Sequence, residues 1–312
     1  MTDILRNNWF VVLIAIIIIG FIGYFIYDTN KDNVSAKTTN NEQVVASINK
    51  DDITADDLYD ESTPYDGSTI YNMYKNAVID QSIKTTKDLK KQASTLESNI
   101  KSNASNQSDD YESTLTTELA KYGYASYEEL NDYCLTSVKE KEMNKKYITK
   151  HFDEVKKAWE EKSPRTVSII KMDVSDADNL TETETKKKSN IDKALEKESF
   201  ADVAKAFSED SNTANKNGFA GYVDSNSTSS DSSSKSTVPA DVVTAAIGLK
   251  KGETSDWITV TSSSGTSLYK VYVKETNSKK IFNAKSDTVS NQALYAILNS
   301  DSSLSYKILD SY

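Results

Sequence analysis

The segment SFADVAKAFSEDSNTANKNGFAGYV, residues 199–223, decides the fold of the C-terminal half of the chain. Its first part has apolar side chains at three- and four-residue steps, which predicts a short helix with one buried face formed by Phe200, Val203, Ala204 and Phe207. Its last part, Gly218 to Val223, contains two glycines and predicts a turn into a strand. A helix followed so closely by a strand indicates a mixed domain rather than a helical bundle.

The elements predicted on both sides of this segment complete a small α+β domain. They are, in chain order, a strand, a polar helix, a short helix and the two strands of a hairpin: Thr166–Met172, 181–198, Val242–Ile247, Asp256–Val260 and Leu268–Val273. A serine-rich loop at 224–237 has no apolar side chains for packing. The order β-α-α-β-α-β-β is typical of an α+β fold, and we assign residues 163–276 to this domain.

A mostly helical region is predicted before this domain, over residues 44–162. Its elements are a short strand followed by amphipathic or charged helices: Val44–Asn49, Ile70–Ile100, 111–121 and 135–161. The last helix must end before Pro164, because proline disfavours helical geometry in the residue that precedes it.

The C-terminal segment 277–312 is expected to pack back on the helical region. Residues 282–298 predict a helix and Tyr306–Leu309 an extended piece. Two short strands cannot satisfy their backbone groups alone, so we expect Tyr306–Leu309 to pair with Val44–Asn49. The predicted fold class is therefore an α+β domain inserted in a mostly helical domain, preceded by one N-terminal transmembrane helix.

The run from Trp9 to Tyr27 carries no charged residue and predicts the membrane anchor. As a helix it would rise about 28 Å, close to the hydrocarbon thickness of a bilayer. We expect residues 1–8 to be a cytoplasmic head, 9–27 a single span, and 28–43 a polar linker to an extracytoplasmic remainder. The alternative is a signal peptide cleaved after Val34-Ser35-Ala36, whose apolar core would be unusually long.

Composition excludes several classes of function. The chain has 37 basic and 47 acidic residues, a net charge of −10, and no dense basic patch, so we expect no nucleic-acid partner. The single histidine and single cysteine exclude a multi-histidine metal site and an internal disulfide framework. No phosphate-binding glycine motif is present, and we expect no cofactor and no metal.

Several motifs, in this order, resemble the PrsA family of extracytoplasmic foldases, whose middle module is a parvulin-type peptidyl-prolyl isomerase. Residues 199–223 resemble the parvulin core, and VPADVVTAAIGLKKGETSDWI (238–258) resembles the helix and turn that follow it. VVASINKDDITADDLYDES (44–62), LAKYGYASYEELNDY (119–133) and LSYKILDSY (304–312) resemble segments of the helical chaperone domain, which is SurA/PrsA-like.

The resemblance implies peptidyl-prolyl cis-trans isomerase (rotamase) chemistry with Asp210 as the catalytic residue. It also implies an apolar wall that binds the proline ring, formed by Tyr222, Val242 and Ile247. The other interpretation of Asp210 is a helix-terminal cap, and the apolar wall is equally compatible with core packing.

The chain departs from the parvulin pattern at both histidine positions. Parvulins carry one histidine on the first strand and another on the last, and the aligned residues here are Ile169 and Leu268. Three functions therefore remain open: an isomerase, a catalytically inactive holding chaperone that uses the parvulin domain as a scaffold or peptide-binding module, and an unrelated membrane-tethered surface protein. The expected partners are unfolded or newly secreted polypeptides, the membrane and, in a homodimer, a second copy of the chain.

The membrane assignment predicts where the protein is found. We expect it in the membrane fraction, with residues beyond about 28 open to protease added to intact cells, because the apolar run is long enough to span the bilayer. Cell fractionation with N-terminal sequencing measures this. A soluble species that begins at Lys37 would show that the run is a cleaved signal peptide.

Overall fold

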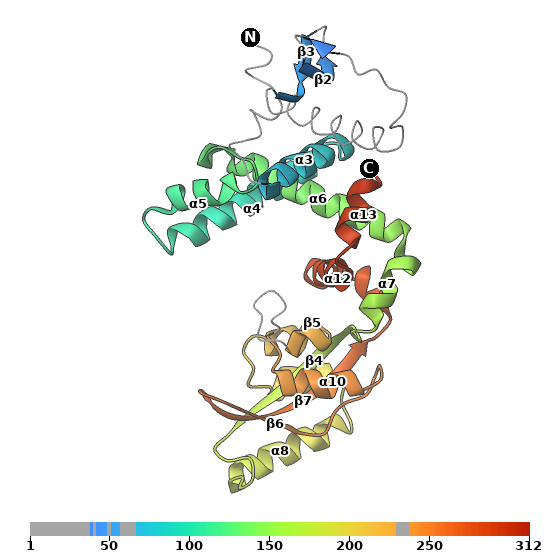
Figure 1. The fold of residues 1–312 in the computed structure, drawn as a ribbon. Coiled ribbons are helices and arrows are strands. Elements are labelled where there is room, and N and C mark those ends of the chain that lie inside the picture. The colour runs from blue at the N-terminus through green and yellow to red at the C-terminus, as the bar shows by residue number, and fades with distance from the viewer. Residues whose placement is uncertain (1–37, 40–41, 49–50, 57–66, 229–236) are drawn as a thin grey trace. The chain divides into compact units, whose positions relative to one another are not determined.

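The computed structural model describes residues 38–39, 42–48, 51–56, 67–228 and 237–312 (Figure 1). The chain divides into two compact units, Met1–Tyr147 with Tyr306–Tyr312, and Ile148–Ser305, so the second unit interrupts the first along the sequence. The predicted span at 9–27 lies outside the described residues. Within the described ranges, no helix has the length and apolar character needed to cross a bilayer.

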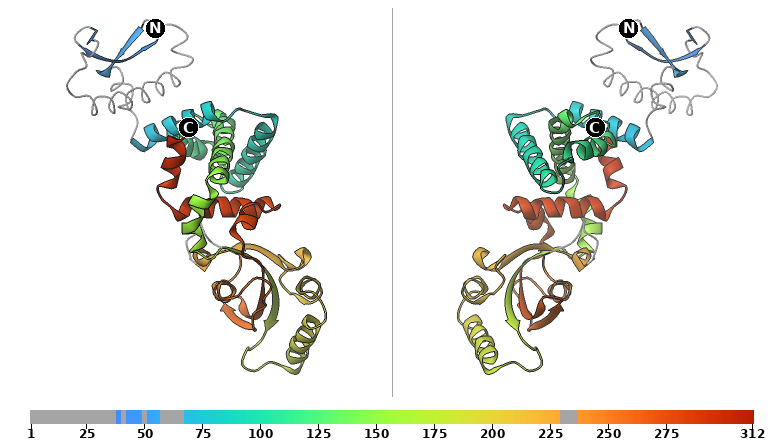
Figure 2. Two further views of the ribbon diagram at one scale, coloured as in Figure 1. Left: turned by 90° about the vertical axis from the view of Figure 1, so that its right-hand side faces the viewer. Right: turned by 90° about the vertical axis from the view of Figure 1, so that its left-hand side faces the viewer.

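The first unit is built mainly from helices (Figure 2). These are α3 (Gly67–Ser82), α4 (Lys87–Ser105), α5 (Tyr111–Ala120) and most of α6 (Leu130–Lys150), with a 3-10 turn η1 at Tyr127–Glu129. The helix predicted at Ile70–Ile100 is broken once, and the Thr86 side chain caps α4 by accepting a hydrogen bond from the Leu89 backbone N–H at 3.2 Å. Cys134 is fully buried in this unit, and burial raises the pKa of its thiol to about 11.

The N-terminal strand is present, but its predicted partner is wrong. Strand β2 (Glu42–Ile48) pairs with β1 (Thr38–Thr39) and β3 (Asp51–Thr54) in a small antiparallel sheet. The C-terminal piece is not extended: Leu304–Asp310 is helix α13. A strand that buried Leu304 and Ile308 would also bury Tyr306 between them, but Tyr306 is 62% exposed, so the burial pattern is helical. Tyr306 on this helix contacts Tyr71 of α3, with ring centroids 5.8 Å apart.

The second unit contains a four-stranded antiparallel sheet in the order β5-β4-β7-β6. The strands are β4 (Arg165–Val174), β5 (Phe219–Val223), β6 (Ile258–Ser262) and β7 (Gly265–Glu275). The predicted hairpin is confirmed, with Ser262 paired to Gly265 at its turn. Strand β4 is buried over most of its length because both faces of the sheet are covered.

Helices pack on both faces of this sheet. On one face, α8 (Glu182–Leu195) and α9 (Phe200–Phe207) contribute Ile191, Phe200 and Val203 to an apolar cluster. On the other face, α10 (Ala240–Gly248) contributes Val242, Val243 and Ala246 to a second cluster. The α+β fold predicted for this region is thus present.

Short elements complete the second unit. They are α7 (Phe152–Glu160), α11 (Ser278–Phe282), α12 (Asp287–Ser300) and the 3-10 turns η2 (Ala214–Lys216) and η3 (Ser225–Thr228). Helices α7 and α11 meet through Phe152 and Phe282, whose ring centroids lie 5.4 Å apart.

Glu184 ties the end of β4 to the start of α8, and this contact predicts a pH dependence of stability. Its carboxylate accepts backbone hydrogen bonds from Ser175 at 2.7 Å and Thr181 at 2.8 Å, which lower its pKa from 4.5 to about 2. A carboxylate whose pKa is lowered by folding stabilises the folded state above its unfolded pKa, and this contribution fades as the pH falls towards the folded pKa.

We therefore expect Glu184→Gln to lower the free energy of unfolding fully above about pH 4.5 and progressively less towards pH 2, where the two proteins converge. Urea unfolding between pH 2.5 and 7 measures the difference. Unfolding curves separated by a constant amount over this range would contradict the role of the charge.

Candidate functional site

The pairing of β4 with β7 decides which side chains share a face of the sheet. In the register, Ile169 lies opposite Val271, Lys171 opposite Tyr269, and Asp173 opposite Ser267. Since alternate residues of a strand point to opposite faces, these six side chains lie on the α10 face. That face is apolar at Ile169 and Val271 and becomes polar towards Asp173 and Ser267.

Ile169 and Leu268, the two residues aligned with the parvulin histidines, do not share one site. Ile169 belongs to the cluster under α10, whereas Leu268 pairs with Met172 and belongs to the cluster under α8 and α9. The two residues therefore lie on opposite faces of the sheet. The residue of β7 that shares the face of Ile169 near Leu268 is Tyr269, because a shift of one residue changes the face.

Two of the predicted wall residues lie together on the α10 face. Val242 is fully buried in the cluster that contains Ile169 and Tyr269, and Ile247 packs against this cluster. Arg165 fixes the helix that carries them. Its buried guanidinium donates to the backbone carbonyls of Ala246 and Leu249 at the C-terminal end of α10, where the helix dipole favours a cation.

Tyr222, the third predicted wall residue, belongs to a different environment. Its hydroxyl donates to Asp224 at 2.6 Å and accepts a hydrogen bond from the Trp159 indole at 2.8 Å, and all three side chains are buried. Tyr222 pairs with Thr166 at the opposite end of β4 from Lys171. Its polar group is therefore engaged in joining α7 to β5.

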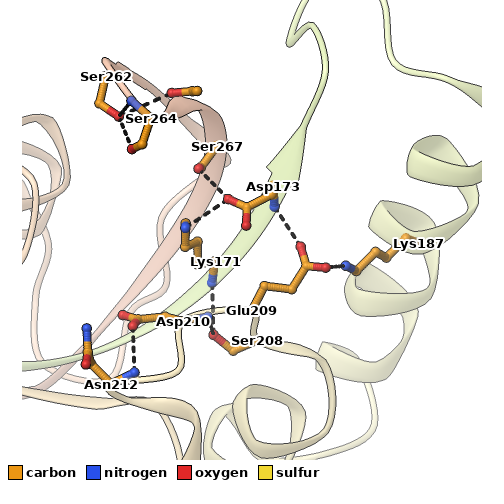
Figure 3. A network of polar contacts seen from close by, with 11 residues as sticks. Lys171, Asp173, Lys187, Ser208, Glu209, Asp210, Asn212, Ser262, Ser264 and Ser267 are labelled. Atoms are coloured by element: carbon orange, nitrogen blue, oxygen red, sulfur yellow. Dashed lines mark hydrogen bonds and ion pairs between the residues drawn. The ribbon is translucent and has the colours of Figure 1, made fainter.

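Asp210 lies in the loop that leads from α9 back to the sheet. Backbone hydrogen bonds fix both ends of the loop to β4. The Glu209 N–H donates to the Lys171 carbonyl at 2.9 Å, and the Ile169 N–H donates to the Gly218 carbonyl at 2.8 Å. The half-buried Asp210 accepts a hydrogen bond from the Asn212 backbone N–H at 3.0 Å, which closes a local turn (Figure 3). Helix α9 ends earlier, at Phe207, so Asp210 does not cap it.

A network of charges surrounds this loop (Figure 3). The Lys171 ammonium lies 2.9 Å from Asp173, which also accepts a hydrogen bond from Ser267 at 2.7 Å. Partial burial acts to raise the pKa of Asp173, but the hydrogen bonds from Lys171 and Ser267 lower the pKa overall. Glu209 accepts from the Asp173 backbone and pairs with Lys187 of α8. Within this network, Asp173 and Glu209 each have a lysine partner at ion-pair distance, whereas Asp210 has none.

Tyr269 and Lys171 are the residues that the sequence analysis missed. Burial is the largest effect that raises the pKa of Tyr269, and the hydrogen bond with Asp173 is the largest that raises the pKa of Lys171. The charge of Asp210 acts to raise the pKa of both groups further, so both interact electrostatically with it. The alternation of LYKVYV in β7 contains the signal, but it can be used only once the register with β4 is known. Chemically, the arrangement offers an apolar surface next to a carboxylate, a hydroxyl and an ammonium group.

The described part of the chain contains no group of three or more His, Cys, Asp or Glu side chains placed to hold a metal ion.

Comparison with protein families gives a match for the same residues. Residues 169–272 match the rotamase family, described as the PPIC-type PPIASE domain. This match confirms the parvulin-type resemblance of the α+β domain, and it covers most of the sheet, α8 to α10 and the Asp210 loop. No curated protein gives a sequence match to the chain.

Solved structures of longer extent are also similar. PrsA from Bacillus subtilis is 20% identical with a TM-score of 0.39, the alignment covering 86% of this chain and 91% of that one. The foldase protein PrsA from Streptococcus pneumoniae is 22% identical with a TM-score of 0.32, covering 86% and 91%. A structure described under SurA-like chaperones of Campylobacter jejuni is 14% identical with a TM-score of 0.25, covering 86% and 98%. With such low TM-scores, the assignment of residues 169–272 rests on the family match.

Gly218 closes the Asp210 loop, and its replacement tests how far the site depends on that closure. Its φ is +76°, and a Cβ atom there would lie 2.7 Å from the Ile169 carbonyl oxygen and 2.6 Å from Ala204 Cβ. We expect Gly218→Ala to lower the free energy of unfolding by about 2–5 kcal/mol, the sum of left-handed strain and overpacking.

Gly252→Ala is the matched control, because Gly252 also has a positive φ, +87°, but open space around its Cα. We expect Gly252→Ala to lower the free energy of unfolding by only the cost of the left-handed backbone conformation, about 1–2 kcal/mol. Chemical denaturation measures both variants. Equal losses would show that the contact between Gly218 and β4 adds nothing.

Proposed function

We propose that this protein is a membrane-anchored extracytoplasmic foldase that assists the folding of secreted polypeptides, and that its PPIC-type domain isomerises X–Pro bonds in them. The observation that carries this proposal is the match of residues 169–272 to the PPIC-type family. The uncharged run at 9–27 supports the anchor, since its length suits a bilayer.

The chemistry of prolyl isomerisation suits the α10 face. Rotation about an X–Pro bond takes tens of seconds because amide resonance must be broken, at a cost of about 18–20 kcal/mol. The reaction needs no nucleophile and no cofactor. It needs an apolar surface for the proline ring and polar groups that favour the twisted amide over the planar one. The partly buried Ile247 and Ile258 of the α10-face cluster offer an apolar surface, and the half-buried Asp210 offers a carboxylate.

A holding chaperone is the second candidate, and one observation favours it. The position expected for the first parvulin histidine is Ile169, whose side chain is 1% exposed and packs in the core. Burying an aliphatic side chain contributes about 1.5–3 kcal/mol to stability, which is typical of a scaffold position. In this form of the proposal the domain binds unfolded segments without accelerating their isomerisation.

A proline-limited refolding assay separates the two candidates. We expect the wild-type chain to accelerate refolding and Asp210→Ala to reduce the acceleration about tenfold, as expected when one interaction of about 1.4 kcal/mol is lost from the transition state. Asp176→Ala is the matched control, because Asp176 closes a similar exposed turn by accepting from the Asp178 backbone at 2.9 Å. This variant should retain full activity.

Three other results have distinct meanings. Suppression of aggregation without acceleration would favour the holding chaperone. Acceleration that persists in Asp210→Ala would exclude Asp210 as the catalytic group while leaving the isomerase intact. A chain that neither accelerates refolding nor suppresses aggregation would contradict both forms of the proposal.

A further inference from the structure

The side chain of Tyr269 combines a buried ring with an unpaired hydroxyl. The residue is 8% exposed and packs in the apolar cluster with Ile169 and Val242. Among the described residues, its hydroxyl forms no hydrogen bond, in contrast to the Tyr222 hydroxyl, which has two buried partners. Among the side-chain nitrogen and oxygen atoms of the described residues, Thr213 Oγ1 is the one that is both fully buried and without a hydrogen bond. The unpaired Tyr269 hydroxyl is therefore not fully buried and reaches solvent.

The position of Tyr269 on the sheet places this hydroxyl where the apolar face becomes polar. Tyr269 pairs with Lys171 on one side and with Ile258 on the other. Ile258 packs against the same cluster, and Lys171 belongs to the charged network beside Asp210. The hydroxyl is therefore a neutral donor at the boundary between an apolar surface and a set of charges.

We propose that the Tyr269 hydroxyl is a catalytic group that donates a hydrogen bond to the prolyl nitrogen of a bound X–Pro segment as the amide twists. This inference rests on the proposed isomerase function and names the donor of that site. Burial raises the pKa of Tyr269, so the hydroxyl keeps its proton at neutral pH and can serve as a donor.

The electronic structure of the amide explains why a donor at this place is effective. In the planar amide the nitrogen lone pair is delocalised onto the carbonyl, and the nitrogen is a poor hydrogen-bond acceptor. Twisting localises the lone pair on nitrogen, so a donor aimed at nitrogen stabilises the transition state more than the ground state. No bond to the proton is broken, and the tyrosine ends the reaction unchanged.

The neighbouring apolar side chains act in the same direction. The planar amide is the more charge-separated form, because resonance places negative charge on oxygen and positive charge on nitrogen. An apolar surface such as the partly buried Ile258, which packs against the same cluster as the buried Ile169 and Val242, disfavours this separation relative to the twisted form. The aliphatic residue at position 169 is thus compatible with catalysis when the donor is Tyr269.

Tyr269→Phe in the full chain, in detergent, tests the inference. Phenylalanine keeps the buried ring and removes only the hydroxyl. We expect kcat/KM for the cis-to-trans isomerisation of an Ala-Pro peptide, measured by NMR exchange, to fall about tenfold, with KM and the thermal unfolding midpoint unchanged. Tyr272→Phe is the matched control: Tyr272 lies three residues along β7 on the opposite face and stacks on Phe200 with centroids 5.3 Å apart. It should retain wild-type kcat/KM.

Failure of the inference and failure of the proposed function give different results. Full activity in Tyr269→Phe would overturn the role of the hydroxyl while the isomerase stands, and so would an equal loss in Tyr272→Phe. A rise in KM without a change in kcat would assign Tyr269 to substrate binding and overturn catalysis by it. A wild-type chain that does not accelerate exchange would overturn the isomerase itself, and the inference with it.

Discussion

The antiparallel pairing of β4 with β7 is the constraint on which the second unit depends. It runs in one register from Val167 opposite Val273 to Val174 opposite Thr266, and β4, which also pairs with β5, is a central strand covered on both faces. Because side chains alternate along a strand, this single register assigns Ile169, Lys171 and Tyr269 to the α10 face and sends Met172 and Leu268 to the other. The Asp210 loop is then fixed by hydrogen bonds to the same strand, so the position of the carboxylate follows from the register as well.

Sequence patterns identified the elements of this unit because its signals are local. The apolar stripe of Phe200, Val203 and Ala204 and the hairpin closed between Ser262 and Gly265 depend on neighbours within a few residues. The failures involve long-range information. Leu268 and Tyr269 are adjacent and both buried, so only the pairing with β4 tells which of them shares a face with Ile169. In the C-terminal segment, YKIL is too short to distinguish a strand from a helix by its pattern, and it is the exposure of Tyr306 between the buried Leu304 and Ile308 that shows the helical spacing.

Residues that a motif alignment assigns to one wall lie in different environments in the structure. Val242 and Ile247 share the apolar cluster with Ile169, whereas the Tyr222 hydroxyl is hydrogen-bonded to Asp224 and Trp159. An alignment preserves the identity of a residue at a position but not the partner of its polar atom. The buried network around Tyr222 requires an acceptor on Asp224, two residues away, and a donor on Trp159, which lies 63 residues away and outside the aligned segment.

The hydrogen bonds of Arg165 have a consequence for how this domain can change over evolution. The guanidinium holds α10 through the main-chain carbonyls of Ala246 and Leu249, and every amino acid supplies such a carbonyl. The side chains of the helix can therefore be exchanged without loss of the anchor, so long as the backbone stays helical. Such an anchor separates the position of the helix from the chemistry of its side chains, which lets mutation alter the apolar face while the helix keeps its place on the sheet.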